Sequence, residues 1–193
     1  TGATAAATRA EPVTRKAPQQ EEGRGQAVRA WSEGVVERKH AQGKLLAGQR
    51  FEKWLADDSY QELDLLARHR AHSSGLEERP YTDGVITGWG TIDGRKVFVF
   101  SQDFTVFGGA LGEVFAEKIH KLMDLALKVG APVIGLNDGA GARIQEGVVS
   151  LACHRGIFHR HVRHRRVSPL TPVNLAHSPG APPTARPSRA RAC

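Results

Sequence analysis

Residues 83–112, DGVITGWGTIDGRKVFVFSQDFTVFGGALG, carry the signals that decide the fold. Two runs rich in β-branched and aromatic residues, 85–92 and 96–101, flank the dipeptide Asp93-Gly94. This dipeptide favours a type I′ turn, which needs positive φ at both central positions, so the two runs are predicted to form a β-hairpin. The glycine-rich segment FGGALG, Phe107 to Gly112, follows the second run and leads into a predicted helix.

The segment after this glycine turn alternates helix and strand signals. Apolar residues from Leu111 to Val129 recur with a 3.6-residue period, and Gly130 is placed to end that helix. PVIGLND, residues 132–138, is typical of a buried strand, GAGAR forms a second glycine turn, and IQEGVVSL starts another helix. Hairpin, helix, strand, turn and helix in this order predict a layered α/β domain.

The segment before the hairpin divides into two parts. Residues 1–25 hold Ala, Thr, Pro, Gln and Glu with few large apolar groups, which predicts a disordered leader. From Val28 to Leu66 the apolar pattern is helical, interrupted by a turn at Ala56 to Ser59. Residues 26–151 are therefore assigned to one domain.

The charge of the chain is unevenly distributed. Its formal net charge is +7, but Ala152 to Cys193 contain eight Arg and no Lys, Asp or Glu, so this tail carries +8 and residues 1–151 carry −1. Six of the ten prolines and five of the nine histidines also lie in the tail, which predicts that residues 152–193 do not pack as a normal domain. The tract HRHVRHRR, residues 159–166, lacks interleaved aromatic residues, so no specific nucleic-acid binding is expected from it.

The cysteines and the apolar runs of the sequence indicate in which compartment the protein is expected. Both cysteines, Cys153 and Cys193, lie in the tail, so no disulfide framework supports the body of the chain. No apolar run approaches the length of a membrane span, and no secretory signal is present. We expect a cytoplasmic protein that binds no membrane.

The two glycine turns are the candidate functional elements. The glycines at 108, 109 and 112 do not match the dinucleotide fingerprint, and DGAGAR lacks the Lys-Ser/Thr pair of a P-loop. The first turn opens a helix, a setting that suits anion binding, and two turns at the ends of neighbouring strands could line one cleft with backbone N–H groups. Tight packing alone is the alternative explanation for the first turn.

The side chains near these turns indicate no catalytic or metal site. Glu113 and Glu117 lie four residues apart on the predicted helix, which is typical of a solvated face. His120 has no Cys or His at metal-ligand spacing and is interpreted as a satisfied surface histidine. No catalytic side chain and no metal ligand is predicted.

Three longer segments resemble one family closely. They are residues 79–119, RPYTDGVITGWGTIDGRKVFVFSQDFTVFGGALGEVFAEKI, residues 121–151, KLMDLALKVGAPVIGLNDGAGARIQEGVVSL, and the lead-in VVERKHAQGKLLAGQRFEKWLADDSYQELD, which departs from the family at Leu46 to Gln49. They are similar to the N-terminal domain of biotin-dependent acyl-CoA carboxyltransferases, in particular the beta chains of propionyl-CoA carboxylases. The strings FSQDFTVFGG and GARIQEG carry most of the specificity.

The resemblance implies a crotonase-like fold built from ββα repeats. It implies transfer of CO2 from carboxybiotin to the α-carbon of propionyl-CoA or a similar acyl-CoA, giving methylmalonyl-CoA from propionyl-CoA. Biotin would be carried on an alpha subunit whose biotin carboxylase uses ATP, and the complete family member would be a homo-oligomer. The acyl-CoA would lie against backbone amides of the two turns, namely Phe107, Gly108, Gly109 and Ala110 in the first and Gly139, Ala140, Gly141, Ala142 and Arg143 in the second.

The resemblance ends near Leu151. The family continues into another Gly-rich turn and a second domain, and neither pattern follows here, so this chain alone is expected to be inactive. A shifted reading frame between the codons for Leu151 and Pro172, a truncation and a sequence artefact would each produce such a tail. The alternatives for function are a non-catalytic remnant that associates with carboxylase subunits, a CoA-binding crotonase relative such as a hydratase, and a basic nucleic-acid binder.

Overall fold

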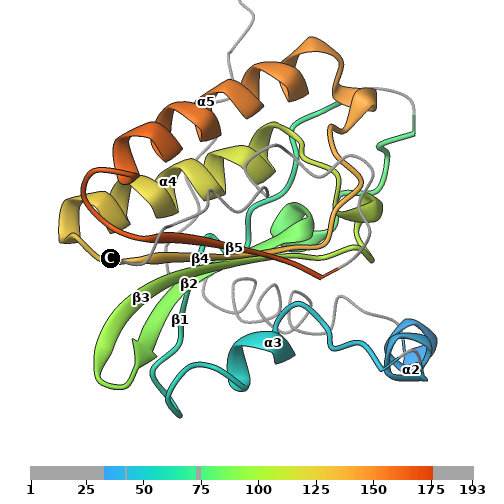
Figure 1. Ribbon diagram of the computed structural model, residues 1–193. Helices are drawn as coiled ribbons and strands as arrows, with labels where there is room; N and C mark the ends of the chain where they lie inside the picture. The colour runs from blue at the N-terminus through green and yellow to red at the C-terminus, as the bar shows by residue number, and fades with distance from the viewer. Residues whose placement is uncertain (1–32, 42, 73–74, 176–193) are drawn as a thin grey trace, which may run out of the picture.

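A five-stranded mixed sheet with helices on both faces forms the centre of the molecule in the computed structural model (Figure 1). The structure describes residues 33–41, 43–72 and 75–175, so the predicted leader at 1–25 and the end of the predicted tail at 176–193 lie outside it. Helices α4 and α5 cover one face of the sheet, and α2 and α3 lie on the other side. The main elements are α2 (Glu33–Ala41), α3 (Gln49–Glu52), β1 (Gln61–Leu63), β2 (Val85–Ile92), β3 (Arg95–Gln102), α4 (Glu113–Val129), β4 (Val133–Asn137), α5 (Val148–His164) and β5 (Leu170–Asn174).

The predicted hairpin is confirmed. β2 and β3 pair antiparallel from Ile92 with Arg95 to Val85 with Gln102. Asp93 and Gly94 both adopt positive φ, 50° and 74°, as a type I′ turn requires. Beyond the hairpin, β3 pairs parallel with β4, and β4 pairs parallel with β5.

The predicted helix after the first glycine turn is also confirmed, with a shifted start. α4 begins at Glu113 because Leu111 pairs with Ala142 in an isolated parallel bridge. It ends at Gly130, which adopts the left-handed conformation (φ 72°), and the Ala131 amide donates to the Ala126 carbonyl at 3.0 Å. This is the hydrogen-bond pattern of a Schellman cap, so the glycine ends the helix as the sequence predicted.

Two hydrophobic clusters bury both faces of the sheet. Toward α4 and α5, the core includes Val85, Phe98, Phe100 and Val133, packed against Phe115 and the rest of the α4 apolar face. Toward α3, the alternate residues Ile86, Val97, Val99 and Leu136 pack with Ala47, Phe51 and Leu55. Strands covered on both faces read as nearly continuous apolar runs, which is the pattern of VFVF and PVIGL.

The helical prediction for Val28 to Leu66 was wrong at its C-terminal end. Residues 61–63 form β1, which pairs antiparallel with Thr87 to Trp89 of β2. A three-residue strand gives too few positions for periodicity to identify it, and the pairing with β2 determines its conformation. The described part of this segment is otherwise helical at α2 and α3, and the turn at 56–59 is present, with the Ser59 amide donating to the Ala56 carbonyl at 3.1 Å.

The expectation that the tail does not pack was wrong for residues 152–175. Helix α5 runs through the predicted boundary, and its buried residues Ser150, Ile157 and His164 are spaced by seven, so they face α4 along one line. The imidazole of His164 is fully buried, with Nε2 2.8 Å from the Met123 carbonyl and Nδ1 2.9 Å from Ser168 Oγ. Only a few side chains of a helix packed on one side are buried, so most arginines of residues 159–166 can point to solvent. The overall composition of a segment is therefore a poor guide to whether it packs.

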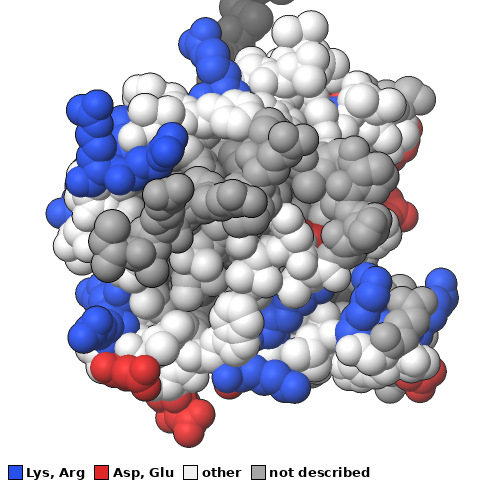
Figure 2. Space-filling view, in the orientation of Figure 1, with Lys and Arg blue, Asp and Glu red and all other residues white. Residues whose placement is uncertain are grey.

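Strand β5 is an edge strand of the described sheet, which explains how it accommodates Pro172. None of the described helices is long and apolar enough to cross a membrane. On the face shown in Figure 2, Lys and Arg side chains lie in several separate groups rather than in one continuous patch.

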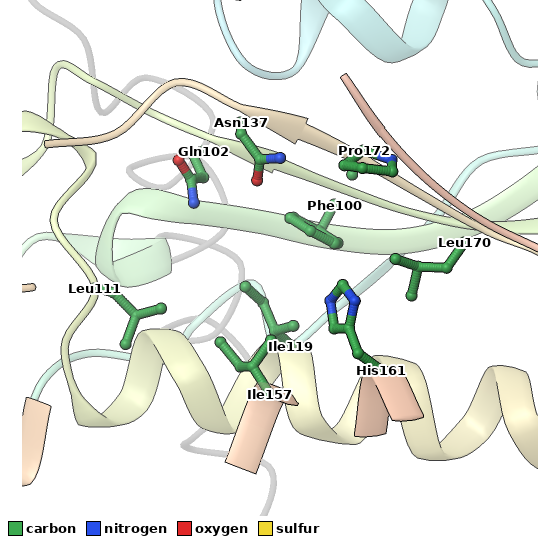
Figure 3. A pocket seen from close by; sticks show the side chains of 10 residues that line it. Phe100, Gln102, Leu111, Ile119, Asn137, Ile157, His161, Leu170 and Pro172 are labelled. Carbon is green, nitrogen blue, oxygen red and sulfur yellow. The ribbon is translucent and has the colours of Figure 1, made fainter. Parts of the chain in front are cut away.

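The stability of the α5 packing is expected to depend on pH through His161. Its ring points from α5 toward Phe100 and Leu170 of the sheet (Figure 3). Burial lowers the pKa of His161 to about 4, and the neighbouring His164 adds to the shift. An unfolded histidine titrates near 6.5, so as the pH falls from about 6.5 to 4 the unfolded chain takes up a proton that the folded chain does not.

We therefore expect the free energy of unfolding to fall between pH 7 and pH 5, by about 1 kcal/mol from His161 after allowance for its partial exposure. Urea unfolding at the two pH values measures this. His161→Phe should reduce the pH dependence by that amount, and His159→Phe, an exposed position on the same helix, should not. Equal pH dependence in the wild type and His161→Phe would show that His161 is not the responsible group.

Candidate functional site

The two glycine turns lie against each other at the carboxyl ends of the parallel strands β3 and β4. The Leu111 amide donates to the Gly141 carbonyl at 2.7 Å, and the Arg143 amide donates to the Leu111 carbonyl at 2.9 Å. The Ala140 amide donates to the Gly108 carbonyl at 3.0 Å. The structure thus brings together the two predicted segments, Phe107 to Ala110 and Gly139 to Arg143.

The backbone of the first turn is held in the left-handed region. Phe107, Gly108 and Gly109 have φ of 49°, 63° and 64°. This conformation is costly for a bulky residue such as phenylalanine, and such strain is found mainly where the surrounding structure enforces it at functional sites. A Cβ atom at Gly109 would collide with the Asp138 carbonyl oxygen, so the close approach of the two turns requires glycine there.

Several backbone amides of the two turns are already used within the protein. Those of Gly109 and Ala110 donate to the carbonyls of Val106 and Phe107 at 2.9 and 3.1 Å. Within the described residues, the amides of Gly108, Gly141 and Ala142 donate to no protein acceptor. Gly108 and Ala142 are half-buried, so their N–H groups are the ones that an oxygen atom of a ligand can reach most directly.

A buried ionic cluster holds the turns in place. The Arg143 side chain is fully buried, and its guanidinium donates to Asp83 Oδ1 at 2.6 Å and Glu146 Oε1 at 3.0 Å. It also donates to the carbonyls of Asp83 and Ala110 at 3.1 and 3.0 Å, and it lies over the Phe107 ring. The side chain of Arg143 is therefore committed to the protein interior.

The N-terminus of α4 holds two carboxylates of the chain itself. Glu146 Oε2 accepts from the Glu113 amide at 2.6 Å, and Asp83 Oδ2 accepts from the Phe115 amide at 2.9 Å. Carboxylates at these positions satisfy otherwise unpaired amides and interact favourably with the helix dipole. The anion-binding position that the sequence suggested at this helix start is thus occupied by the chain's own carboxylates.

No pattern in the sequence indicated the turn that supplies Asp83. Thr82, Asp83 and Gly84 all have positive φ, at 66°, 51° and 84°. The buried Lys118 ammonium donates to the carbonyls of Thr82 (3.1 Å) and Val85 (2.5 Å) on either side of Asp83. Burial raises the pKa of Asp83, whereas Arg143 and the Phe115 amide stabilise its charged form. Burial lowers the pKa of Lys118 to about 8, and nearby carboxylates oppose that shift.

The exposed face predicted for Glu113 and Glu117 is confirmed, whereas His120 is not the surface histidine that the sequence suggested. Glu113 and Glu117 lie on an exposed face of α4 and pair with Arg70 at 3.4 and 2.6 Å. His120 is half-buried, and its Nε2 lies 3.2 Å from the Cys153 carbonyl oxygen. Gly156 of α5 allows this approach, because a Cβ atom there would collide with the His120 ring.

Comparison with known proteins gives one consistent result. The carboxyl transferase domain model matches residues 38–178. The chain is 56% identical to the propionyl-CoA carboxylase beta chain of Saccharopolyspora erythraea over 145 residues, which are 75% of this chain and 27% of that protein. It is 52% identical over 158 residues to the biotin-dependent acetyl-/propionyl-coenzyme A carboxylase beta5 subunit of Mycobacterium tuberculosis, covering 81% of this chain and 29% of that protein.

Among solved structures, transcarboxylase 12S with methylmalonyl-coenzyme A and methylmalonic acid bound superposes with a TM-score of 0.79 and 36% identity, covering 86% of this chain and 32% of that chain. The predicted fold class is thereby confirmed. The chain spans less than a third of the length of the curated relatives it matches. The described helices, sheet and paired glycine turns, together with the matched residues 38–178, show that this chain belongs to the carboxyl transferase domain family.

Proposed function

We propose that this chain is the N-terminal part of the carboxyltransferase (beta) subunit of a biotin-dependent acyl-CoA carboxylase, with propionyl-CoA or a similar acyl-CoA as substrate. The observation that supports it most directly is the pair of hydrogen-bonded glycine turns, in which the amides of Gly108, Gly141 and Ala142 are available as donors. Transcarboxylase 12S, which has the same fold, is described with methylmalonyl-coenzyme A bound.

The proposed role of the turns is to stabilise negative charge. Removing a proton from the α-carbon of an acyl-CoA places charge on the thioester oxygen, and preorganised backbone amides stabilise that charge. Gly108 and Ala142 are half-buried, so an oxygen at their N–H groups would be partly shielded from water. Asp83, Glu146 and Arg143 are paired with one another, so they hold the turns rather than exchange protons with the substrate.

The partners follow from the same proposal. Biotin, carried on an alpha subunit whose biotin carboxylase consumes ATP, supplies the carboxyl group. This chain would contribute the acyl-CoA side of the site, and the biotin side would come from the larger part of the relatives that lies beyond the matched region.

An exposed apolar stripe is consistent with a place in a larger assembly. Ile144, Val148, Leu151 and Val162, on η3 (Ile144–Glu146) and α5, are 80%, 79%, 62% and 64% exposed. Their spacing places them along one side of the helix, where further protein would bury them. The homo-oligomer implied by the family resemblance is proposed for the complete subunit.

The test measures two properties of the 193-residue chain separately: its binding of propionyl-CoA and its formation of methylmalonyl-CoA. We expect propionyl-CoA to bind more tightly than free CoA in isothermal titration calorimetry, because the thioester oxygen adds contacts with the turn amides. The same chain mixed with biotin carboxylase, biotin, ATP, bicarbonate and propionyl-CoA should form no methylmalonyl-CoA. Equal binding of propionyl-CoA and CoA would contradict the assignment of the thioester to the turns, and chain-dependent turnover would contradict the need for the rest of the subunit.

A further inference from the structure

Arg50 of α3 makes a set of contacts that no sequence pattern indicated. Its Nη2 donates to Asp138 Oδ2 at 2.7 Å, and its Nη1 donates to Ser101 Oγ and the Gln102 carbonyl at 3.2 and 3.0 Å. The side chains of Arg50 and Asp138 are only 11% and 4% exposed. A charge-assisted pair that is largely shielded from water has a defined geometry, because each partner depends on the other for its hydrogen bonds.

All these contacts lie where β3 and β4 end and the second glycine turn begins. Ser101 and Gln102 are the last residues of β3, and Asp138 directly follows β4. The Asp138 amide donates to Gln102 Oε1 at 2.9 Å, so both its backbone and its side chain are held. The carbonyl oxygen of Asp138 lies so close to Gly109 of the first turn that a Cβ atom there would collide with it.

The second turn is therefore held at both ends from opposite layers of the molecule. Arg143 at its C-terminal end is bound to Asp83 and Glu146 on the side of α4. Arg50 binds its N-terminal end from α3, which lies on the other side of the sheet (Figure 1). Between these anchors lie the amides of Gly141 and Ala142, which donate to no protein acceptor among the described residues.

We propose that Arg50 is a positioning residue for acyl-CoA, which fixes the direction of the Gly141 and Ala142 amides through Asp138. The proposal rests on the proposed function, since it assigns Arg50 a part in the same site. Arg50 would act through Asp138 rather than on the ligand itself. Its effect depends on the planar guanidinium, which can bind Asp138 and the end of β3 at the same time.

The variants are chosen to separate positioning from stability. Arg50→Met leaves the Asp138 carboxylate buried and unpaired, whereas Arg50→Met with Asp138→Asn removes the pair and its charge together. Arg50→Lys keeps the charge but offers one donor group in place of the fork. Arg160→Met serves as a control for the loss of a paired arginine away from both turns, because Arg160 Nη2 binds Asp124 Oδ2 at 2.8 Å in a more exposed pair (23% and 38%).

In the full chain, we expect Arg50→Met to weaken the binding of propionyl-CoA by about 10-fold or more, since misplaced donors lose most of their contribution. The double variant should regain thermal stability but not affinity, Arg50→Lys should be intermediate, and Arg160→Met should bind like the wild type. Affinity that recovers in step with the melting temperature in the double variant would overturn the proposal.

A second readout does not depend on the ligand. Hydrogen exchange followed by mass spectrometry should show faster exchange in residues 138–143 of the double variant, with α4 unchanged. If the wild type binds no propionyl-CoA, the proposed function fails, and this exchange measurement alone decides the role of Arg50. Unchanged exchange in residues 138–143 would show that Arg50 does not position the turn.

Discussion

Replacing Arg143 by methionine is expected to lower the free energy of unfolding by about 3–5 kcal/mol, because it leaves buried carboxylates without their cation. Asp83 and Glu146 would keep their hydrogen bonds to the first turn of α4, but the charge between them would be lost. The guanidinium also donates to the Ala110 carbonyl, so the first glycine turn should loosen together with the helix start. Urea unfolding monitored by circular dichroism measures the change.

Two further variants make this expectation specific. Arg70→Met removes an arginine that also pairs with α4, but that pair is exposed and should contribute little to stability. Adding Asp83→Asn and Glu146→Gln to Arg143→Met should recover part of the lost stability, because the uncompensated charges are then gone. If Arg143→Met unfolds at the same urea concentration as Arg70→Met, the buried cluster does not hold the fold.

Gly109→Ala should cost about 3 kcal/mol or more, because it combines a left-handed backbone with a collision between the turns. The added methyl group would meet the Asp138 carbonyl oxygen and lie 3.0 Å from Gly139 Cα. Both neighbours are backbone atoms of the other turn, so the two turns must move apart. Because this separation also misplaces the amides of the second turn, binding of propionyl-CoA should be lost.

The adjacent glycine provides a matched control. Gly108 has nearly the same φ, 63° against 64°, but a Cβ atom there has only Ala140 Cβ near it, at 3.7 Å. Gly108→Ala therefore includes the conformational cost without the collision and should lower the free energy of unfolding by about 1 kcal/mol. Equal losses in the free energy of unfolding for Gly108→Ala and Gly109→Ala would mean that the close contact between the turns contributes nothing to stability.

The β-hairpin, α4 and the positions of both glycine turns could be predicted from the sequence, because each depends on local chemistry. Asp93-Gly94 adopts its turn because of its own φ preferences, and Gly130 ends α4 for the same reason. The strings FSQDFTVFGG and GARIQEG were sufficient for the family, which the comparisons confirm. The role of their nine turn residues in acyl-CoA binding stays a prediction.

The packing of the tail and the strand β1 were misjudged from the sequence for one shared reason. Composition and short-range period describe a segment by itself, whereas β1 exists through its pairing with β2 and α5 through its contact with α4. His164 illustrates this, since it belongs to a basic tract yet is buried with a partner 41 residues away.

By itself, therefore, the sequence determined the hairpin, α4 and the glycine turns of this protein, its fold class and its family. Only the tertiary structure decided which ion pairs hold the two glycine turns. Arg143 pairs with Asp83, 60 residues away in the sequence, and Arg50 pairs with Asp138, 88 residues away. Ion pairs at such separations leave no periodic pattern in the chain. They form because desolvated charges are stable in the interior only beside an opposite charge, and the fold determines which charges meet.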